Sequence, residues 1–152
     1  CPNHTVGRVT PFKTRGIIAM AGTFGYELDV TKIPEEDRDM IASQVETYKK
    51  YCPLIQSGDY YRIASYQNNH YFDCYEIVSK DKKEAIFVFV QVIAQPNMHS
   101  IRVKLKGLDN EAKYKINGTV YDADALMNGG FIIKRPWGDF QAELFHIEKI
   151  ND

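Results

Sequence analysis

The spacing of apolar residues changes near Asp59, and this change limits what the chain can fold into. Before Asp59 the apolar residues recur at the spacing of amphipathic helices. After it they form short runs and alternating stretches separated by turn residues, as in β-strands. We therefore predict a mostly β protein in two parts. Residues 1–57 form a helical part, and residues 58–152 form a C-terminal antiparallel β-sandwich.

The first part contains a predicted helix over residues 10–22. Thr10 followed by Pro11 is a favourable N-cap and first-turn pair, and Gly22 is a favourable C-terminal residue. Gly16 lies in the middle of this helix and costs roughly 1 kcal/mol relative to alanine. The prediction of this helix therefore depends mainly on the residues at its two ends.

A second helix is predicted over residues 34–52. It begins at Pro34, and three acidic residues follow that interact favourably with the positive end of the helix dipole. Pro53 is expected to stop it, because proline lacks the amide hydrogen that the helix needs. Its predicted buried face follows helical spacing and consists of Ile41, Val45, Tyr48 and Cys52.

Between these helices, residues 23–28 predict a single strand, because they are rich in β-branched and aromatic types. Its backbone donors and acceptors need neighbouring strands that residues 1–57 do not supply. A helix, a lone strand and a helix do not form a domain by themselves. The first part is therefore predicted to be the remnant of a larger α/β barrel.

The second part predicts six to eight short antiparallel strands, which favours a sandwich. Residues 84–94 are apolar on both faces, so we expect a central strand that is covered on both sides. One helical turn is predicted over residues 122–127. The other predicted strands cover residues 59–66, 71–78, 100–106 and a final segment that ends at Ile147.

Composition excludes several classes of function. The formal net charge of −1 argues against a nucleic-acid partner, which would require a basic surface. No apolar run approaches the roughly 20 residues that span a membrane. The three cysteines are widely spaced and the histidines lack ligand spacing, so neither a metal nor another cofactor is expected. Reduced thiols favour a cytoplasmic location.

Five stretches of the chain resemble one enzyme family. The chain is similar, in order and over nearly its whole length, to the end of the catalytic barrel and the closing β domain of family 36 α-galactosidases. The resemblance implies that residues 10–22 are the seventh barrel helix, residues 23–28 the eighth strand and residues 34–52 the eighth helix. The stretches are TPFKTRG (10–16), MAGTFGYELD (20–29), LIQSGDYYR (54–62), LKGLD (105–109) and DFQAELFH (139–146).

The resemblance also implies a function for the parent protein. Family members are retaining glycosidases, so the parent is expected to hydrolyse terminal α-galactosides such as melibiose and raffinose-type oligosaccharides. The two catalytic aspartates of the family lie upstream of Cys1. We therefore assign no catalytic residue to this chain, expect it to be inactive alone, and expect it to support the upstream barrel.

The first residues of the chain are the candidate substrate-side loop. In a (β/α)8 barrel the active site lies at the C-terminal ends of the strands. Asn3, His4 and Arg8 would follow the seventh strand, where they either line the pocket mouth or only fix the loop to the barrel. Glu27 and Asp29 share a strand face, but we interpret them as a strand end and a loop start, with Asp29 bonded to nearby backbone.

Aromatic residues raise two alternatives. A non-catalytic carbohydrate-binding module would use exposed rings to stack on sugars, whereas a structural domain would bury them in its core or against the last barrel helix. The β domain could also mediate subunit contacts, because enzymes of this family are often homo-oligomers. The rings concerned are Tyr60, Tyr61, Tyr66, Tyr71, Phe72, Tyr75 and Trp137.

Overall fold

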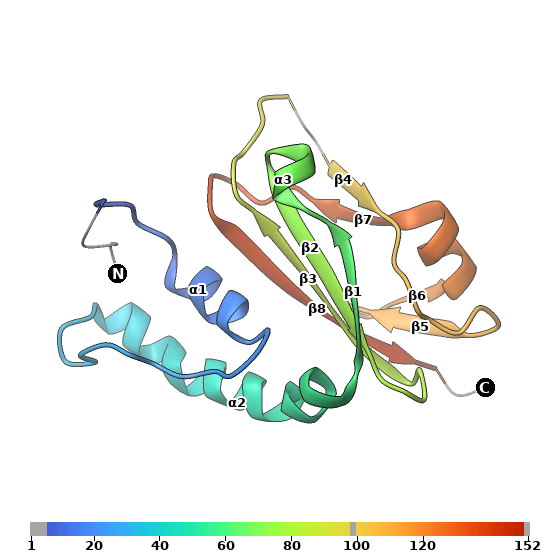
Figure 1. Ribbon diagram of the computed structural model, residues 1–152, viewed down its shortest axis with the longest axis horizontal. Helices are drawn as coiled ribbons and strands as arrows, with labels where there is room; N and C mark the ends of the chain where they lie inside the picture. Colours follow the sequence, from blue (N-terminus) through green and yellow to red (C-terminus); the bar gives the residue numbers. More distant parts are fainter. Residues whose placement is uncertain (1–5, 98–99, 151–152) are drawn as a thin grey trace.

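The computed structural model describes residues 6–97 and 100–150, and this part contains eight strands (Figure 1). They are β1 (Asp59–Ala64), β2 (Phe72–Val78), β3 (Glu84–Gln91), β4 (Ser100–Val103), β5 (Lys113–Ile116), β6 (Thr119–Asp122), β7 (Phe131–Lys134) and β8 (Gln141–Lys149). Six form one antiparallel sheet in the order β1-β2-β3-β8-β5-β6, and β4 pairs with β7 in a second sheet. The predicted mostly β, antiparallel fold is confirmed.

Helices cover the face of the large sheet that the β4–β7 sheet leaves open (Figure 1). The helical elements are α1 (Phe12–Ala19), α2 (Glu35–Ser57), α3 (Tyr66–Asn69) and the π-helix η1 (Ala125–Gly130). α1 and α2 pack on the sheet, α3 connects β1 to β2, and η1 leads into β7. The molecule therefore has three layers, with the large sheet in the middle.

β3 carries the core on both of its faces. Ala85, Phe87 and Phe89 pack toward the β4–β7 sheet, whereas Ile86 and Val88 pack toward the helices. All five are almost completely buried. Burying one large apolar side chain contributes about 1.5–3 kcal/mol, so this strand contributes heavily to stability. The predicted central strand, covered on both sides, is confirmed.

α1 is attached to β8 where that strand has a free edge. β5 pairs only with the end of β8, so the amide of Ala142 has no strand partner on that side. The buried Thr14 hydroxyl accepts a hydrogen bond from this amide at 3.1 Å. Lys13 forms an ion pair with Glu143 at 2.8 Å. A side chain thus replaces the missing ladder partner and fixes α1 on the sheet.

α2 continues through Pro53 to Ser57, so the prediction that Pro53 stops the helix is wrong. The last turn is stabilised from two sides. The Ser57 hydroxyl donates to the Pro53 carbonyl at 2.6 Å, and Leu54 is buried against the sheet. Gly58 alone separates this helix from β1. A β-carbon at Gly58 would lie 2.6 Å from a methyl of Ile77, so the junction is tightly packed.

The predicted buried face of α2 is also wrong. Its buried residues are Gln44, Tyr51 and Leu54, whereas Ile41, Val45, Tyr48 and Cys52 are only partly buried. The sheet contacts the face that carries Tyr51 and Leu54. A search for apolar spacing cannot find Gln44, because this residue is polar and its burial depends on hydrogen bonds.

Several element ends differ from the prediction. α1 begins after Pro11 rather than at Thr10, because Pro11 itself has an extended backbone. The connection between β1 and β2 is a short helix, since Ser65 caps it and His70 ends it in a left-handed conformation. The turn expected at 122–127 is the wider η1. β1, β3 and β4 end at Ala64, Gln91 and Val103, short of their predicted ends.

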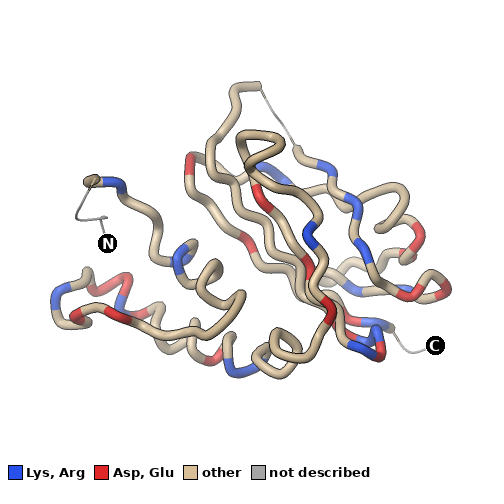
Figure 2. Tube along the Cα trace, viewed as in Figure 1, with Lys and Arg blue, Asp and Glu red and all other residues tan. Residues whose placement is uncertain are grey.

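Residues 100–106 alternate as predicted. Ile101, Val103 and Leu105 are buried. The three basic residues between and after them are exposed, and the tube in Figure 2 is blue at intervals along this segment. The stripe consists of Arg102, Lys104 and Lys106. An exposed basic stripe discourages strand-to-strand association with other chains.

Glu76 is a carboxyl group inside the β domain. It is 0% exposed, on the face of β2 that also carries Cys74 and Val78. One oxygen, Oε2, accepts the backbone N–H of Lys106 at 2.8 Å, and Oε1 has no hydrogen-bond partner among the residues that the structure describes. Burial raises the pKa of Glu76 to about 8, although the Lys106 hydrogen bond lowers it. The carboxyl group is therefore protonated at neutral pH.

Candidate functional site

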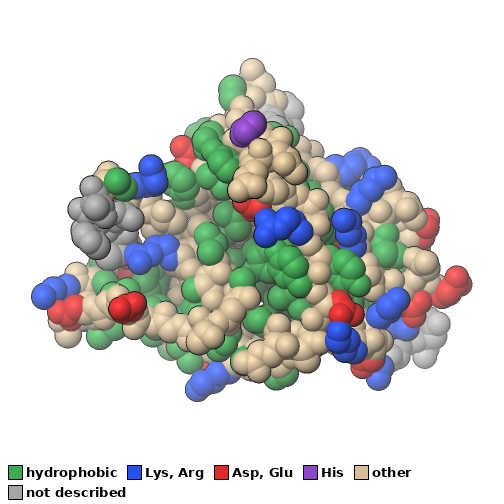
Figure 3. All heavy atoms as spheres, in the orientation of Figure 1, with side chains coloured by type: hydrophobic (Ala, Val, Ile, Leu, Met, Phe, Trp, Pro, Cys, Tyr) green, Lys and Arg blue, Asp and Glu red, His purple; other side chains and the backbone are tan. Residues whose placement is uncertain are grey.

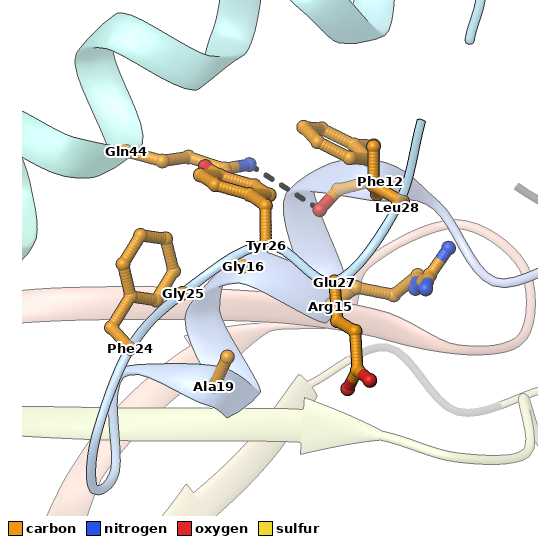
Figure 4. Close-up of a pocket in the computed structure, with 10 residues that line it drawn as sticks. All are labelled: Phe12, Arg15, Gly16, Ala19, Phe24, Gly25, Tyr26, Glu27, Leu28 and Gln44. Carbon is orange, nitrogen blue, oxygen red and sulfur yellow. Dashed lines mark hydrogen bonds between the residues drawn. The ribbon is translucent and has the colours of Figure 1, made fainter. Parts of the chain in front are cut away.

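A pocket of about 300 Å³ lies between α1, residues 24–28 and α2 (Figure 4). It occupies the part of the chain for which a barrel remnant was predicted. The lining residues are Phe12, Arg15, Gly16, Ala19, Phe24, Gly25, Tyr26, Glu27, Leu28 and Gln44.

Gln44 connects the three segments around this pocket. Its Nε2 donates to the Phe12 carbonyl at 3.3 Å, and its Oε1 accepts the Tyr26 hydroxyl at 2.7 Å (Figure 4). A buried amide is stable only when it is hydrogen-bonded, and both ends of this one are. Gln44 therefore fixes residues 24–28 and the start of α1 on α2.

Gly16 allows α1 to approach Gln44 closely. A β-carbon at Gly16 would lie 2.4 Å from Cδ and Oε1 of Gln44, a distance that real side chains do not adopt. The glycine that weakens the predicted helix is thus required by packing, not by backbone conformation.

Aromatic rings hold residues 24–28 on the helices. Tyr26 stacks on Phe12 at 5.8 Å between ring centroids, and Phe24 contacts both Tyr26 and Tyr48 at 5.2 and 5.1 Å. The Tyr48 hydroxyl donates to the Gly22 carbonyl at 3.0 Å. Burial raises the pKa of Tyr26, which keeps its hydroxyl a donor. The segment is therefore held by side chains.

Residues 23–28 are not a strand, so this prediction is wrong at the level of hydrogen-bonded structure. Within residues 6–97 and 100–150, no strand pairs with the segment. Its side chains nevertheless alternate as in a strand. Phe24, Tyr26 and Leu28 are partly buried, whereas Gly25 and Glu27 are exposed. The sequence produces a strand-like segment without the neighbours that would complete a ladder.

Of the three predicted substrate-side residues, Asn3 and His4 lie outside the described residues. Arg8 is exposed, and its guanidinium lies 6.0 Å from the centre of the Phe140 ring. This is the range of a cation–π interaction. Arg8 therefore contacts the connection between β7 and β8, and its place beside a substrate stays a prediction.

Asp29 forms a local turn, as predicted. Its Oδ1 accepts the Thr31 hydroxyl at 2.6 Å and the Thr31 amide at 3.0 Å, and Lys32 pairs with Oδ2 at 3.1 Å. The Thr31 side-chain hydrogen bond, followed by that from Lys32, lowers the pKa of Asp29. This exposed carboxylate is held ionised by its neighbours, and Glu27 lines the nearby pocket.

Neither a cluster of metal ligands nor a membrane-spanning helix occurs in the described residues. Within the described ranges, no three His, Cys, Asp or Glu side chains gather as metal ligands would. His146 instead pairs with Glu84 at 2.7 Å. None of the helices described is both long enough and apolar enough to cross a membrane.

Most of the conspicuous aromatic residues are structural. Phe72 is buried in the core, and Tyr61 and Tyr71 pack against it. Tyr75 packs on the helix side of the sheet, where burial raises its pKa to about 12. Hydrophobic side chains gather between the helical part and β1 in Figure 3. Two of these rings are exposed, Tyr60 with 52% and Trp137 with 88% of its surface.

Sequence reasoning missed the polar contacts around Gln44. Neither Gln44 nor Tyr26 lies in a motif, and the two are 18 positions apart. The available signal was Gly16, whose cost in a helix interior requires a compensating close approach.

Comparison with known proteins identifies both parts of the chain. Residues 1–58 match the family model described as melibiase. Residues 72–147 match the model of the glycosyl hydrolase family 36 C-terminal domain. The two matches fall on either side of the change in hydrophobic spacing.

Curated relatives are similar over the whole chain. The chain is 40% identical over 152 residues to the α-galactosidase Mel36A of Lactobacillus acidophilus, covering 99% of this chain and 20% of the relative. It is 39% identical over 151 residues to the α-galactosidase AgaA of Geobacillus stearothermophilus, with 98% and 20% covered. The chain thus spans about a fifth of the length of the curated relatives it matches.

Solved structures share the fold. A variant of Geobacillus stearothermophilus AgaA in complex with raffinose superimposes with a TM-score of 0.92 at 38% identity, covering 98% of this chain and 21% of that one. The α-galactosidase from Lactobacillus brevis has a TM-score of 0.92 at 36% identity, with 99% and 22% covered. Fold and sequence agree that the chain belongs to glycoside hydrolase family 36 and corresponds to the C-terminal portion of its α-galactosidases.

Proposed function

We propose that this chain is the C-terminal portion of a retaining α-galactosidase, in which residues 1–57 complete the catalytic (β/α)8 barrel and residues 58–152 form the closing β domain. The observation that carries the proposal is the segment 23–28. It has the alternation of a strand and is attached to two helices, yet no described strand pairs with it. An upstream barrel supplies the missing neighbours.

The reaction requires two carboxyl groups that this chain does not provide. In a retaining glycosidase, one carboxylate attacks the anomeric carbon while the other carboxyl protonates the leaving oxygen, and water then hydrolyses the galactosyl-enzyme. The two groups lie about 5–5.5 Å apart. The Asp29 carboxylate instead accepts a hydrogen bond from Thr31 and forms an ion pair with Lys32. We assign both catalytic carboxyl groups to the upstream part of the protein.

The role of this chain in catalysis is to position the last strand and its loop. Gln44 and Tyr26 hold residues 24–28 on α2, and the Asp29 turn directly follows that segment. In a barrel this turn lies at the C-terminal end of the strand, where substrate binds. These contacts therefore fix the position of the Asp29 turn, which would form one side of the substrate pocket.

The substrates we propose are terminal α-galactosides such as melibiose and raffinose-type oligosaccharides. Support comes from relatives, because structures of Geobacillus stearothermophilus AgaA variants contain raffinose and stachyose. We also propose a cytoplasmic, homo-oligomeric parent enzyme. Cys52 and Cys74 are free thiols, which suits a reducing compartment.

An activity assay with an aryl α-galactoside tests the catalytic proposal. The 152-residue chain should give no turnover, whereas the full-length protein should be active. Turnover by the purified short chain that disappears in Glu27→Gln or Asp29→Asn would refute the proposal. If the short chain is active and neither variant reduces its turnover, other carboxyl groups of this chain are responsible. That result would also contradict the proposal.

Hydrogen exchange tests the barrel proposal separately. Amides of residues 23–28 should exchange rapidly in the 152-residue chain and be protected in the full-length protein, because only there do they join a ladder. The amides of β3 serve as the control, since they should be protected in both. Equal exchange of residues 23–28 in the two proteins would show that no barrel strand pairs with them.

A further inference from the structure

Trp137 is the most exposed large hydrophobic side chain in the described ranges, at 88%. It lies in the connection between β7 and β8, which we call the tryptophan loop (residues 135–140). An apolar ring of this size in water is unfavourable unless something covers it. The contacts of the loop show whether its backbone holds the ring in this exposed position.

The tryptophan loop is held by a buried amide. Gln91 in β3 is only 2% exposed, and its Nε2 donates to the carbonyls of Pro136 and Gly138, which flank Trp137 on both sides. Because a buried amide must satisfy its hydrogen bonds, these contacts fix the backbone around Trp137. The core of the sheet therefore positions the exposed ring.

Further contacts anchor both ends of the loop. The Arg135 guanidinium donates to the Gln95 carbonyl, and Asp139 Oδ1 accepts the Ala94 amide at 2.7 Å. The Phe140 amide donates to the Val92 carbonyl at 3.2 Å. Both charged side chains of the loop thus bond to backbone of the segment that follows β3. What remains for an external contact is chiefly the Trp137 ring.

The loop adopts an unfavourable backbone conformation. Gly138 has φ 86° and Phe140 has φ 54°. Positive φ is uncommon for a bulky residue such as phenylalanine, and such conformations persist where surrounding contacts impose them. They cluster at functional sites. The contacts around the loop therefore hold Phe140 in a conformation that it would rarely adopt alone.

The loop lies next to the N-terminal segment. Arg8 contacts the Phe140 ring at 6.0 Å, and in Figure 1 the connection before β8 lies on the side of the sheet nearest that segment. The chain corresponds to the C-terminal portion of relatives about five times its length, so most of a relative's polypeptide precedes the counterpart of Arg8. In a protein of that length, the polypeptide that precedes Arg8 would join this chain beside the tryptophan loop.

We propose that the tryptophan loop is an interface element, in which Trp137 inserts into an apolar site on the upstream catalytic part of the same polypeptide. This inference rests on the proposed function, because it requires a larger enzyme. Tryptophan is the residue type most enriched at energetically dominant interface positions. A rigid loop adds affinity because little freedom is lost on contact.

The first test compares thermal unfolding of Trp137→Ala in two proteins. In the 152-residue chain the midpoint should not change, because the ring contacts solvent. In the full-length protein the midpoint should fall by about 2–4 °C or more. Val120→Ala is the matched control, since Val120 is 51% exposed on β6 and should change neither midpoint. Equal effects of Trp137→Ala in both proteins would overturn the proposal.

A second test does not depend on stability. Trp137 is the only tryptophan in this chain. After labelling with 5-fluorotryptophan, its resonance in the full-length protein is the one missing from the Trp137→Phe spectrum. Its shift between H₂O and D₂O should be large in the short chain and small in the full-length protein. A large shift in both would show that the ring stays in water.

Other occupants give different results. If Trp137→Ala raises KM for raffinose without changing the midpoint of full-length unfolding, the ring contacts sugar and the proposal is wrong. If the variant reduces the oligomeric mass without changing the subunit's own unfolding, the partner is a second copy and the proposal is again wrong. Galactosidase activity of the unmodified full-length protein is measured alongside. Its absence would count against the proposed function, while the solvent shift still decides the position of Trp137.

Discussion

The two parts of the molecule satisfy their backbones in different ways. In the β domain every strand has a partner within the same chain, and β3 is buried on both faces. In the helical part, residues 23–28 have the side-chain alternation of a strand but are held by ring contacts and by Gln44, with no strand partner among the described residues. A segment with alternating side chains therefore forms a β-strand only where a neighbouring strand can hydrogen-bond to it.

The largest expected difference between the two parts is in their contribution to stability. Phe87→Ala should lower the free energy of unfolding of the 152-residue chain by about 3–5 kcal/mol, because it empties a fully buried site. Phe24→Ala should cost less than about 2 kcal/mol, since Phe24 is only partly buried here. Urea unfolding measures both. Equal losses would show that the helical part is as well packed as the sheet.

Glu76 should make the stability of the β domain depend on pH. Its folded pKa of about 8 lies above the ordinary value of 4.5, so the folded state binds more protons between these values. The contribution of Glu76 to stability should therefore be greatest below about pH 4.5 and fall as pH rises to about 8, by at most about 5 kcal/mol.

Comparison with Glu76→Gln isolates this effect. The amide oxygen can still accept the Lys106 N–H, but the side chain no longer titrates. Unfolding free energies measured at several pH values should show a smaller decline in the variant. Parallel curves for the two proteins would mean that Glu76 is not the group responsible. Cys74, Tyr61 and Tyr114 belong to the core that surrounds this face of β2, and they are unchanged in both proteins.

Gly16→Ala should destabilise the helical part by about 1–3 kcal/mol, because the added methyl overlaps the Gln44 amide. Gly22→Ala is the matched control, since nothing lies within 4 Å of a β-carbon there. Urea unfolding followed by helical circular dichroism measures both variants. A stabilised Gly16→Ala chain would show that α1 and α2 are not in close contact.

The smallest expected effect belongs to Tyr26→Phe. Loss of the hydroxyl removes one hydrogen bond to Gln44 and should cost about 1 kcal/mol. Tyr60→Phe provides the control, because the Tyr60 ring is about half exposed and no hydrogen bond to its hydroxyl is among the described contacts. In the full-length enzyme, we expect Tyr26→Phe to lower kcat more than Tyr60→Phe does. Identical kinetics would argue against a positioning role for the Tyr26 hydroxyl.

The sequence predicts the parts of the fold whose partners follow a regular spacing. β3 and residues 100–106 are predicted because apolar runs and alternation directly encode burial. The end of α2 is not predicted, because Pro53 is tolerated through the packing of Leu54 and the Ser57 hydrogen bond. Gln44 is not predicted, because a buried amide depends on partners that lie far away in sequence.

The candidate site was less predictable than the fold. The resemblance correctly assigns the chain to its family, but Asn3 and His4 lie outside the described residues and Arg8 contacts Phe140. In the sequence, Trp137 is only one aromatic residue among many. Its exposure depends on Gln91, which lies 46 positions earlier and carries no local signal.

The junction at Gly58 couples α2 closely to the large sheet. α2 has 23 residues and is therefore about 35 Å long, and a single residue joins it to the edge of the sheet. Such a joint leaves no slack for the sheet to swing independently. A displacement of the N-terminal end of α2 would therefore also displace β1, the edge strand of the large sheet.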